Sequence, residues 1–129
     1  MKTSIPLLCA AATLLCGAVP AFAHHSLAGE FDPNKTIPIR GAVTKLEWFN
    51  PHIWIDLDVT AADGSIEKWR CEMGSPNQLI RAGWAKKDLP LGTIIKGDAN
   101  PARDGSNTCS TRFITLDDGT PVFSRNGTQ

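Results

Sequence analysis

The chain has 129 residues, with 13 basic and 13 acidic side chains and a formal net charge of zero at pH 7. This length fits one small domain of about 100 residues behind a targeting segment. The neutral balance argues against a nucleic-acid partner, because proteins that bind nucleic acids need clustered cations to displace phosphate counterions.

Residues 1–23 have the pattern of a secretory signal peptide. Lys2 supplies a positive start, an uncharged apolar stretch follows, and Ala21 and Ala23 supply the small residues that precede a cleavage site. The apolar stretch is short for a membrane span, and no second one follows. We therefore expect a soluble periplasmic protein that begins at His24. Loss of Lys2 leaves 12 basic against 13 acidic residues in the mature chain.

The rest of the chain predicts an N-terminal arm over residues 24–35, one β-domain over residues 36–123 and a disordered tail over residues 124–129. Alternating apolar and polar residues predict strands that start near residues 36, 53, 65, 93 and 109, and a last hairpin reaches Phe123. The apolar positions change parity within the first strand, which predicts a bulge or bend near Gly41.

A helix is predicted between the third and fourth strands. Ser75 can cap it, Pro76 fits its first position, and Gln78 completes a capping box, so we expect a helix from Pro76 to about Ala82. Leu79 and Ile80 are expected to face a core that also contains Ile37, Ile39, Val43, Ile53, Ile55, Leu57, Ile94 and Ile114. This order of elements favours a small OB-like barrel of five or six strands, and a small β-sandwich is the alternative.

Several short motifs occur together along the mature chain. They are Ala23-His24-His25-Ser26, Glu30-Phe31-Asp32, Asn50-Pro51-His52 with Trp54, and Gly74-Ser75-Pro76-Asn77 with Leu79, Arg81 and Gly83-Trp84. In this combination the chain resembles a family of short exported bacterial proteins that is catalogued as a domain of unknown function. The resemblance covers nearly the whole mature chain, and it implies a small periplasmic β-rich domain without an established activity.

Three histidines, His24, His25 and His52, are the candidate metal ligands. Cleavage before His24 gives it a free α-amine, and this amine and the ring Nδ1 can chelate one metal ion. A further imidazole from His25 or His52 would supply a third nitrogen, and three nitrogens favour Cu(II) over Mg(II) or Ca(II). The arrangement is similar to the histidine brace of lytic polysaccharide monooxygenases, although the chain has no tyrosine. The alternative is a polar tail, with His52 bonded to a turn carbonyl.

Other patterns are less specific. Cys71 and Cys109 remain after cleavage, and the sequence leaves open whether they form a disulfide or stay unpaired. Asp56 and Asp58 share one strand face, which is typical of a solvated surface. Further candidates are a polar pocket of Arg70, Glu72 and Asn77, and an aromatic face of Trp48, Trp54, Trp69 and Trp84, for which core and rim packing is the simpler interpretation.

The residues assemble no nucleophile–base set and no phosphate-binding loop, so we expect binding rather than catalysis. The first hypothesis is an exported protein that binds copper through the mature N-terminal histidine. The alternative is a metal-free periplasmic module that binds a partner protein or a small ligand.

Overall fold

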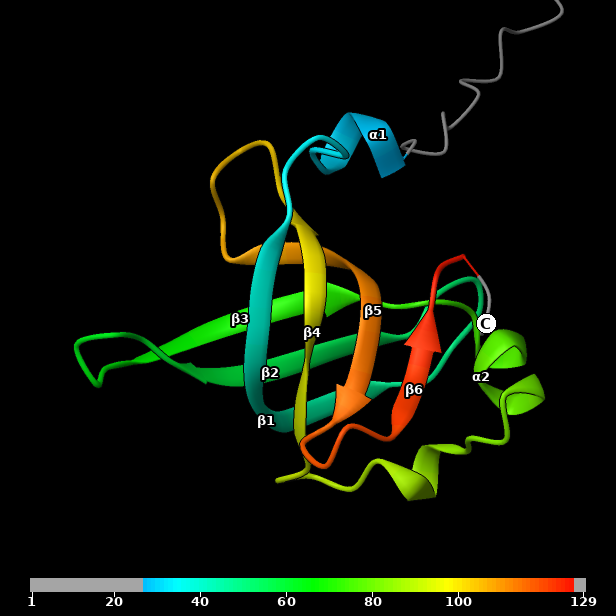
Figure 1. Cartoon of the computed structure of the whole chain (residues 1–129). Coiled ribbons are helices and arrows are strands. Elements are labelled where there is room, and N and C mark those ends of the chain that lie inside the picture. The colour runs from blue at the N-terminus through cyan, green and yellow to red at the C-terminus, as the bar shows by residue number, and fades with distance from the viewer. Residues whose placement is uncertain (1–26, 127–129) are drawn as a thin grey trace, which may run out of the picture.

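The computed structural model describes residues 27–126, which form six strands and three short helices (Figure 1). In chain order these are α1 (Leu27–Glu30), β1 (Ile37–Glu47), β2 (Trp54–Thr60), β3 (Ile66–Glu72), α2 (Pro76–Arg81), the 3-10 helix η1 (Lys86–Asp88), β4 (Ile94–Pro101), β5 (Thr108–Leu116) and β6 (Pro121–Ser124). Within this part of the chain, no helix has the length and apolar character needed to cross a membrane.

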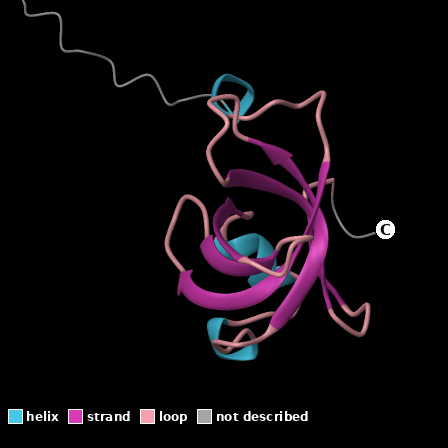
Figure 2. Ribbon diagram, turned by 90° about the vertical axis from the view of Figure 1, so that its left-hand side faces the viewer, coloured by secondary structure: helices cyan, strands magenta, loops and turns pink. Residues whose placement is uncertain are grey.

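Five strands close into a barrel. The strand order is β3-β2-β1-β4-β5, a parallel pairing between β5 and β3 closes the ring, and β6 lies outside it, paired only with β5. With α2 between β3 and β4, this is the topology of an OB barrel, so the predicted fold is confirmed and the sandwich alternative is not adopted. Figure 2 shows the strands curving around one another, with α1 and η1 at opposite ends.

The core comes from alternate residues of the strands. Ile53, Ile55 and Leu57 point inward from the second strand and its entry, as the period of two predicts. The fourth strand differs from expectation, because Ile95 is the fully buried residue and Ile94 is only half-buried. Ile95 pairs with Gly41 of β1 and Leu116 of β5, so the register on both sides sets which parity faces inward.

The irregularity in β1 lies beyond the predicted position. The register between β1 and β2 shifts between Val43 and Lys45, not at Gly41. Gly41 serves close strand packing instead, since a β-carbon there would lie 2.7 Å from the carbonyl oxygen of Asp58.

Helix α2 begins as predicted. The Ser75 hydroxyl accepts a hydrogen bond from the Gln78 backbone N–H, and the Gln78 side chain accepts one from the Ser75 backbone N–H. Leu79 is fully buried, but Ile80 is 56% exposed, which corrects the expectation that both face the core. Neighbouring helical residues differ in direction by about 100°, so one short helix against a barrel buries only one of the two.

The segments before and after the barrel are partly fixed to it. Phe31 of the arm is buried and forms a β-bridge with Ala102, and Arg103 N–H donates to the Glu30 carbonyl at 2.9 Å. The arm also contains the short helix α1. At the other end, Ser124 belongs to β6 and Arg125 is hydrogen-bonded, although both were assigned to the disordered tail.

Candidate functional site

A small polar pocket of about 150 Å³ lies where β3, β5 and β6 meet the segment that enters β2. Its lining residues come from five separate parts of the chain: His52, Glu72, Met73, Gly74, Gln78, Ser110, Thr111, Phe123 and Arg125. Of the three predicted metal ligands, only His52 belongs to this pocket, and His24 and His25 lie outside the described residues.

His52 is held beside Glu72 by backbone pairing that continues past the ends of β2 and β3. Ile53 N–H donates to the Gly74 carbonyl at 3.0 Å, and Met73 N–H donates to the Ile53 carbonyl at 2.8 Å. The ring Nδ1 of His52 contacts the Glu72 carboxylate. The predicted alternative, a ring bonded to a turn carbonyl, is therefore wrong.

Glu72 is a buried acid, and its neighbours include groups that raise its pKa and groups that lower it. Burial raises the pKa of the Glu72 carboxyl, and the carboxylate of Glu30 adds to this rise. His52 and Arg125 act in the opposite direction, because the charge of the Arg125 guanidinium and the hydrogen bond from the His52 ring both favour the ionised acid. The His52 ring and the Arg125 guanidinium thus compensate part of the cost of keeping this carboxylate out of water.

Arg125 also lines the pocket. Its guanidinium donates to the side-chain oxygen of Asn100 at 2.9 Å, to the carbonyl and hydroxyl of Ser110 at 3.0 and 2.8 Å, and to the Thr111 carbonyl at 2.6 Å. Burial lowers the pKa of Arg125, and the charge of Arg112 lowers it further. With so many donors already engaged, Arg125 fixes β5 against the chain after β6 and leaves little capacity for a ligand.

The pairing of His52 and Glu72 has a definite chemical consequence. When Nδ1 donates to a carboxylate, the ring is fixed in one tautomer and orientation, and Nε2 keeps its lone pair for a metal ion or a proton. Among the described residues, Glu72 is the only polar partner of the His52 ring, whose side chain is 40% exposed. Within residues 27–126 no group of three or more His, Cys, Asp or Glu side chains is arranged to hold a metal ion.

The other candidate residues are engaged in structural contacts. Asp56 pairs with Arg70 at 3.1 Å and Asp58 with Lys68 at 2.6 Å, as expected for a solvated sheet face. The predicted pocket of Arg70, Glu72 and Asn77 does not form, because Arg70 instead bridges Asp56 and Glu47 across the strands.

The remaining aromatic and sulfur-containing candidates also have structural roles. Trp54 lies under the Arg70 guanidinium, 5.0 Å from ring centroid to Cζ, while the other three tryptophans are half-buried against the core. Cys71 and Cys109 form a disulfide.

Sequence reasoning missed most of the pocket. Gln78 was identified only as a helix cap, Ser110 and Thr111 as strand residues, and Arg125 as part of a tail. The last hairpin was predicted to end at Phe123, and β6 continues by one residue to Ser124. The pairing of Phe113 with Ser124 carries this strand to Arg125, whose N–H donates to the Arg112 carbonyl at 2.9 Å.

Comparison with known proteins bears on the family. The chain is similar to the dimeric N-terminal domain of the PriB protein from Thermoanaerobacter tencongensis, with 22% identity, a TM-score of 0.48, and coverage of 64% of this chain and 96% of that one. No curated protein matches the chain. The profile of a family of unknown function, DUF6152, matches residues 11–111, in agreement with the resemblance found in the sequence. The chain belongs to the DUF6152 family.

Proposed function

We propose that the protein is an exported metal-binding protein that holds a copper ion between His24, as the first residue of the mature chain, and the ring of His52. The observation that carries this proposal is the contact between the His52 Nδ1 and the buried Glu72 carboxylate. Histidines that bind metals almost always make such a contact through the nitrogen that does not bind the metal.

His24 would supply the other nitrogens. Its α-amine, with an ordinary pKa of about 7.7–8.0, loses its proton readily to a metal at neutral pH, and its ring closes a chelate on the same ion. Together with Nε2 of His52 this makes three nitrogen donors, a set suited to Cu(II). His25 is the alternative source of the third nitrogen.

The position of the N-terminal arm supports the proposal that His24 and His52 bind the same metal ion. Glu30 lies close enough to Glu72 for their carboxylates to repel each other. His24 precedes Glu30 by six residues, so the chain keeps it within about 20 Å of Glu30. The signal-peptide pattern supports export, and so does the Cys71–Cys109 disulfide, because disulfides persist in oxidising compartments.

The test uses untagged protein purified from the periplasm after mass spectrometry has established its first residue. Cu(II) is titrated by calorimetry and examined by electron paramagnetic resonance. We expect binding well above that of a His-His dipeptide, and we expect one glycine added before His24 to weaken it at least tenfold. His52→Ala should remove one nitrogen from the spectrum, and Glu72→Gln should weaken binding about tenfold.

His25→Ala is the matched control, because it removes a neighbouring imidazole and leaves the proposed ligands in place. Thermal unfolding of each variant separates loss of the fold from loss of the site. Binding no tighter than that of the dipeptide, or indifference to the added glycine, would show that the histidines form a polar tail. Loss of a nitrogen in His25→Ala but not in His52→Ala would move the third ligand to His25.

A further inference from the structure

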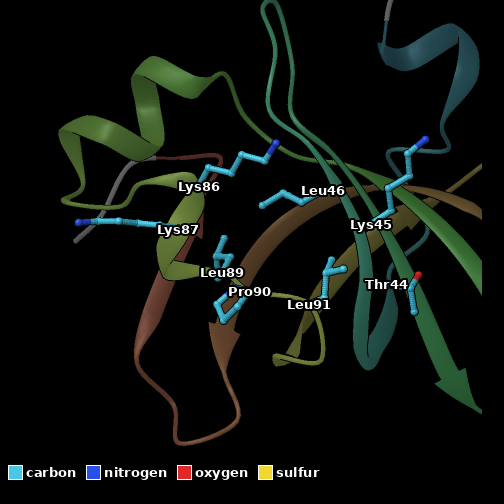
Figure 3. Close-up of a pocket in the computed structure, with 8 residues that line it drawn as sticks. All are labelled: Thr44, Lys45, Leu46, Lys86, Lys87, Leu89, Pro90 and Leu91. Carbon is cyan, nitrogen blue, oxygen red and sulfur yellow. The ribbon is translucent and has the colours of Figure 1, made fainter.

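An apolar groove lies beside η1, at the end of the barrel opposite to α1, and it shares no lining residue with the His52 pocket. One wall is β1, through Thr44, Lys45 and Leu46, and the other is η1 with the loop that follows it, through Lys86, Lys87, Leu89, Pro90 and Leu91 (Figure 3). The cavity volume is about 660 Å³, within the range of about 300–1,000 Å³ that is usual for small-molecule sites.

The two walls are joined by backbone hydrogen bonds. Gly92 N–H donates to the Val43 carbonyl at 2.7 Å, and Val43 N–H donates to the Thr93 carbonyl at 2.9 Å. The Thr93 hydroxyl closes the loop on itself by donating to the Pro90 carbonyl at 2.6 Å. The groove is therefore preformed, and these polar groups of its loop wall are already satisfied.

The interior of the groove is aliphatic. Leu46 and Leu89 form its buried floor, while Leu91 is 68% exposed at its side. An exposed leucine beside a buried apolar floor gives a ligand apolar surface to cover, at about 25 cal/mol for each Å² removed from water.

The charge at the mouth of the groove is positive. Lys86 extends toward Leu46, whereas Lys87 points away from it (Figure 3). Lys45 is paired with Glu47 at 2.5 Å, but Lys86 has no ion-pair partner within residues 27–126. Asp88, the nearest acid in η1, is engaged because its carboxylate accepts the Ala85 N–H at 2.8 Å. A free ammonium group at the mouth of an aliphatic groove complements an anionic head attached to an apolar tail.

We infer that this groove binds a monomeric amphiphile with a carboxylate head and an unbranched aliphatic tail. The tail lies along Leu46, Leu89 and Leu91, and the head meets Lys86. This site is separate from the proposed metal site, and its occupation does not depend on copper. The cavity volume of about 660 Å³ is that of a site for a single small molecule.

The experiment titrates the untagged protein with decanoate and dodecanoate below their micelle concentrations, using calorimetry and backbone amide NMR shifts. We expect saturable binding, shifts centred on residues 44–46 and 86–91, and affinity that rises about two- to fourfold for each added methylene group. Decanol tests the charge, and it should bind at least fivefold more weakly than decanoate.

Two pairs of variants test the residues. Lys86→Glu should weaken decanoate binding about fivefold or more, while Lys35→Glu, the same change at an exposed lysine outside the groove, should weaken it less than twofold. Leu91→Ala should weaken it about fivefold, and Ile66→Ala, which truncates another exposed apolar residue outside the groove, should have no effect. All four positions are exposed, so folding is preserved.

Three outcomes would overturn the inference. They are equal binding of decanol and decanoate, equal effects of Lys86→Glu and Lys35→Glu, and binding to anionic phospholipid vesicles in the absence of binding to the monomers. The last would assign the groove to a membrane surface.

Discussion

Cys71 and Cys109 lie directly opposite each other in the parallel pairing of β3 with β5, with their α-carbons 4.5 Å apart and their side chains fully buried. This pairing covers only three residues of each strand, from Arg70 to Glu72 and from Thr108 to Ser110, yet it is the one that closes the barrel. The disulfide therefore stabilises the shortest strand pairing of the closed barrel.

Replacing both cysteines should destabilise the protein strongly. The disulfide spans 38 residues, and the chain-entropy estimate for a loop of this length is about 4 kcal/mol. We expect Cys71→Ala/Cys109→Ala to lose about this much free energy of unfolding, measured by urea denaturation. As a control, a reducing agent should destabilise the wild-type protein and leave the double variant unchanged. A loss below about 1 kcal/mol would show that backbone pairing alone holds the two strands together.

Two adjacent isoleucines in β4 should respond very differently to truncation. Ile95 is 1% exposed within the core, so Ile95→Ala should cost about 2–5 kcal/mol in free energy of unfolding. Ile94→Ala should cost less than half as much, because Ile94 is only half-buried and lies outside the core cluster. Chemical denaturation of both variants checks this, and equal losses would mean that both residues are packed in the core.

The same pair shows how far the sequence predicts this fold. Two local patterns place their elements correctly. Alternation of apolar residues predicts β2, and the capping box at Ser75 predicts α2, because each pattern is compatible with only one local structure. The dipeptide Ile94-Ile95 offers both parities, and only pairing with β1 and β5 decides between them. The barrel was predictable from the order of elements, whereas the inward parity of β4 and the outward Ile80 depend on tertiary contacts.

The candidate site was much less predictable. His52 was identified from its residue type, but its partner Glu72 is 20 positions away, and the other wall comes from β5 and the chain after β6. A short strand outside the barrel brings Arg125 to Ser110, and no local pattern marks that contact. The residue type alone therefore identified His52 as a candidate, whereas its contacts depend on the tertiary fold.

Arg125 should contribute more to stability than its neighbour Arg112. Arg125 donates hydrogen bonds to Asn100, Ser110 and Thr111, whereas the guanidinium of Arg112 donates to the exposed Thr36 hydroxyl at 2.8 Å. Arg125→Met should cost about 2 kcal/mol, because it leaves two carbonyls and an amide oxygen without their donor.

Arg112→Met, the matched control, should change the free energy of unfolding by less than about 0.5 kcal/mol. Amide hydrogen exchange should report where the loss occurs, with protection falling first in β6. If β6 stays protected in Arg125→Met, or if both variants lose the same free energy, then Arg125 is not the anchor of this strand.

Three turns with the sequence Asp-Gly-Ser or Asp-Gly-Thr should make stability depend on pH in the acid range. Asp63, Asp104 and Asp118 each accept a hydrogen bond at 2.9 Å from the backbone N–H two residues later. Hydrogen bonds from the serine or threonine hydroxyl and backbone lower the pKa of all three carboxyls below their ordinary value of 3.8. Because the folded pKa is the lower one, this stabilisation is fully present above pH 3.8 and is lost as the pH falls through the folded pKa values.

The triple variant Asp63→Ala/Asp104→Ala/Asp118→Ala should therefore have a lower Tm than the wild-type protein at pH 7, and the difference should shrink as the pH is lowered below 3.8. Asp98→Ala removes an exposed carboxylate that makes no turn hydrogen bond, so its Tm should follow that of the wild type across the same range. Carboxyl NMR titration of the wild-type protein measures the three pKa values directly. The absence of a Tm difference at pH 7 would mean that the turns are stabilised by their glycines alone, since Gly64, Gly105 and Gly119 all have positive φ and are kept in the variant.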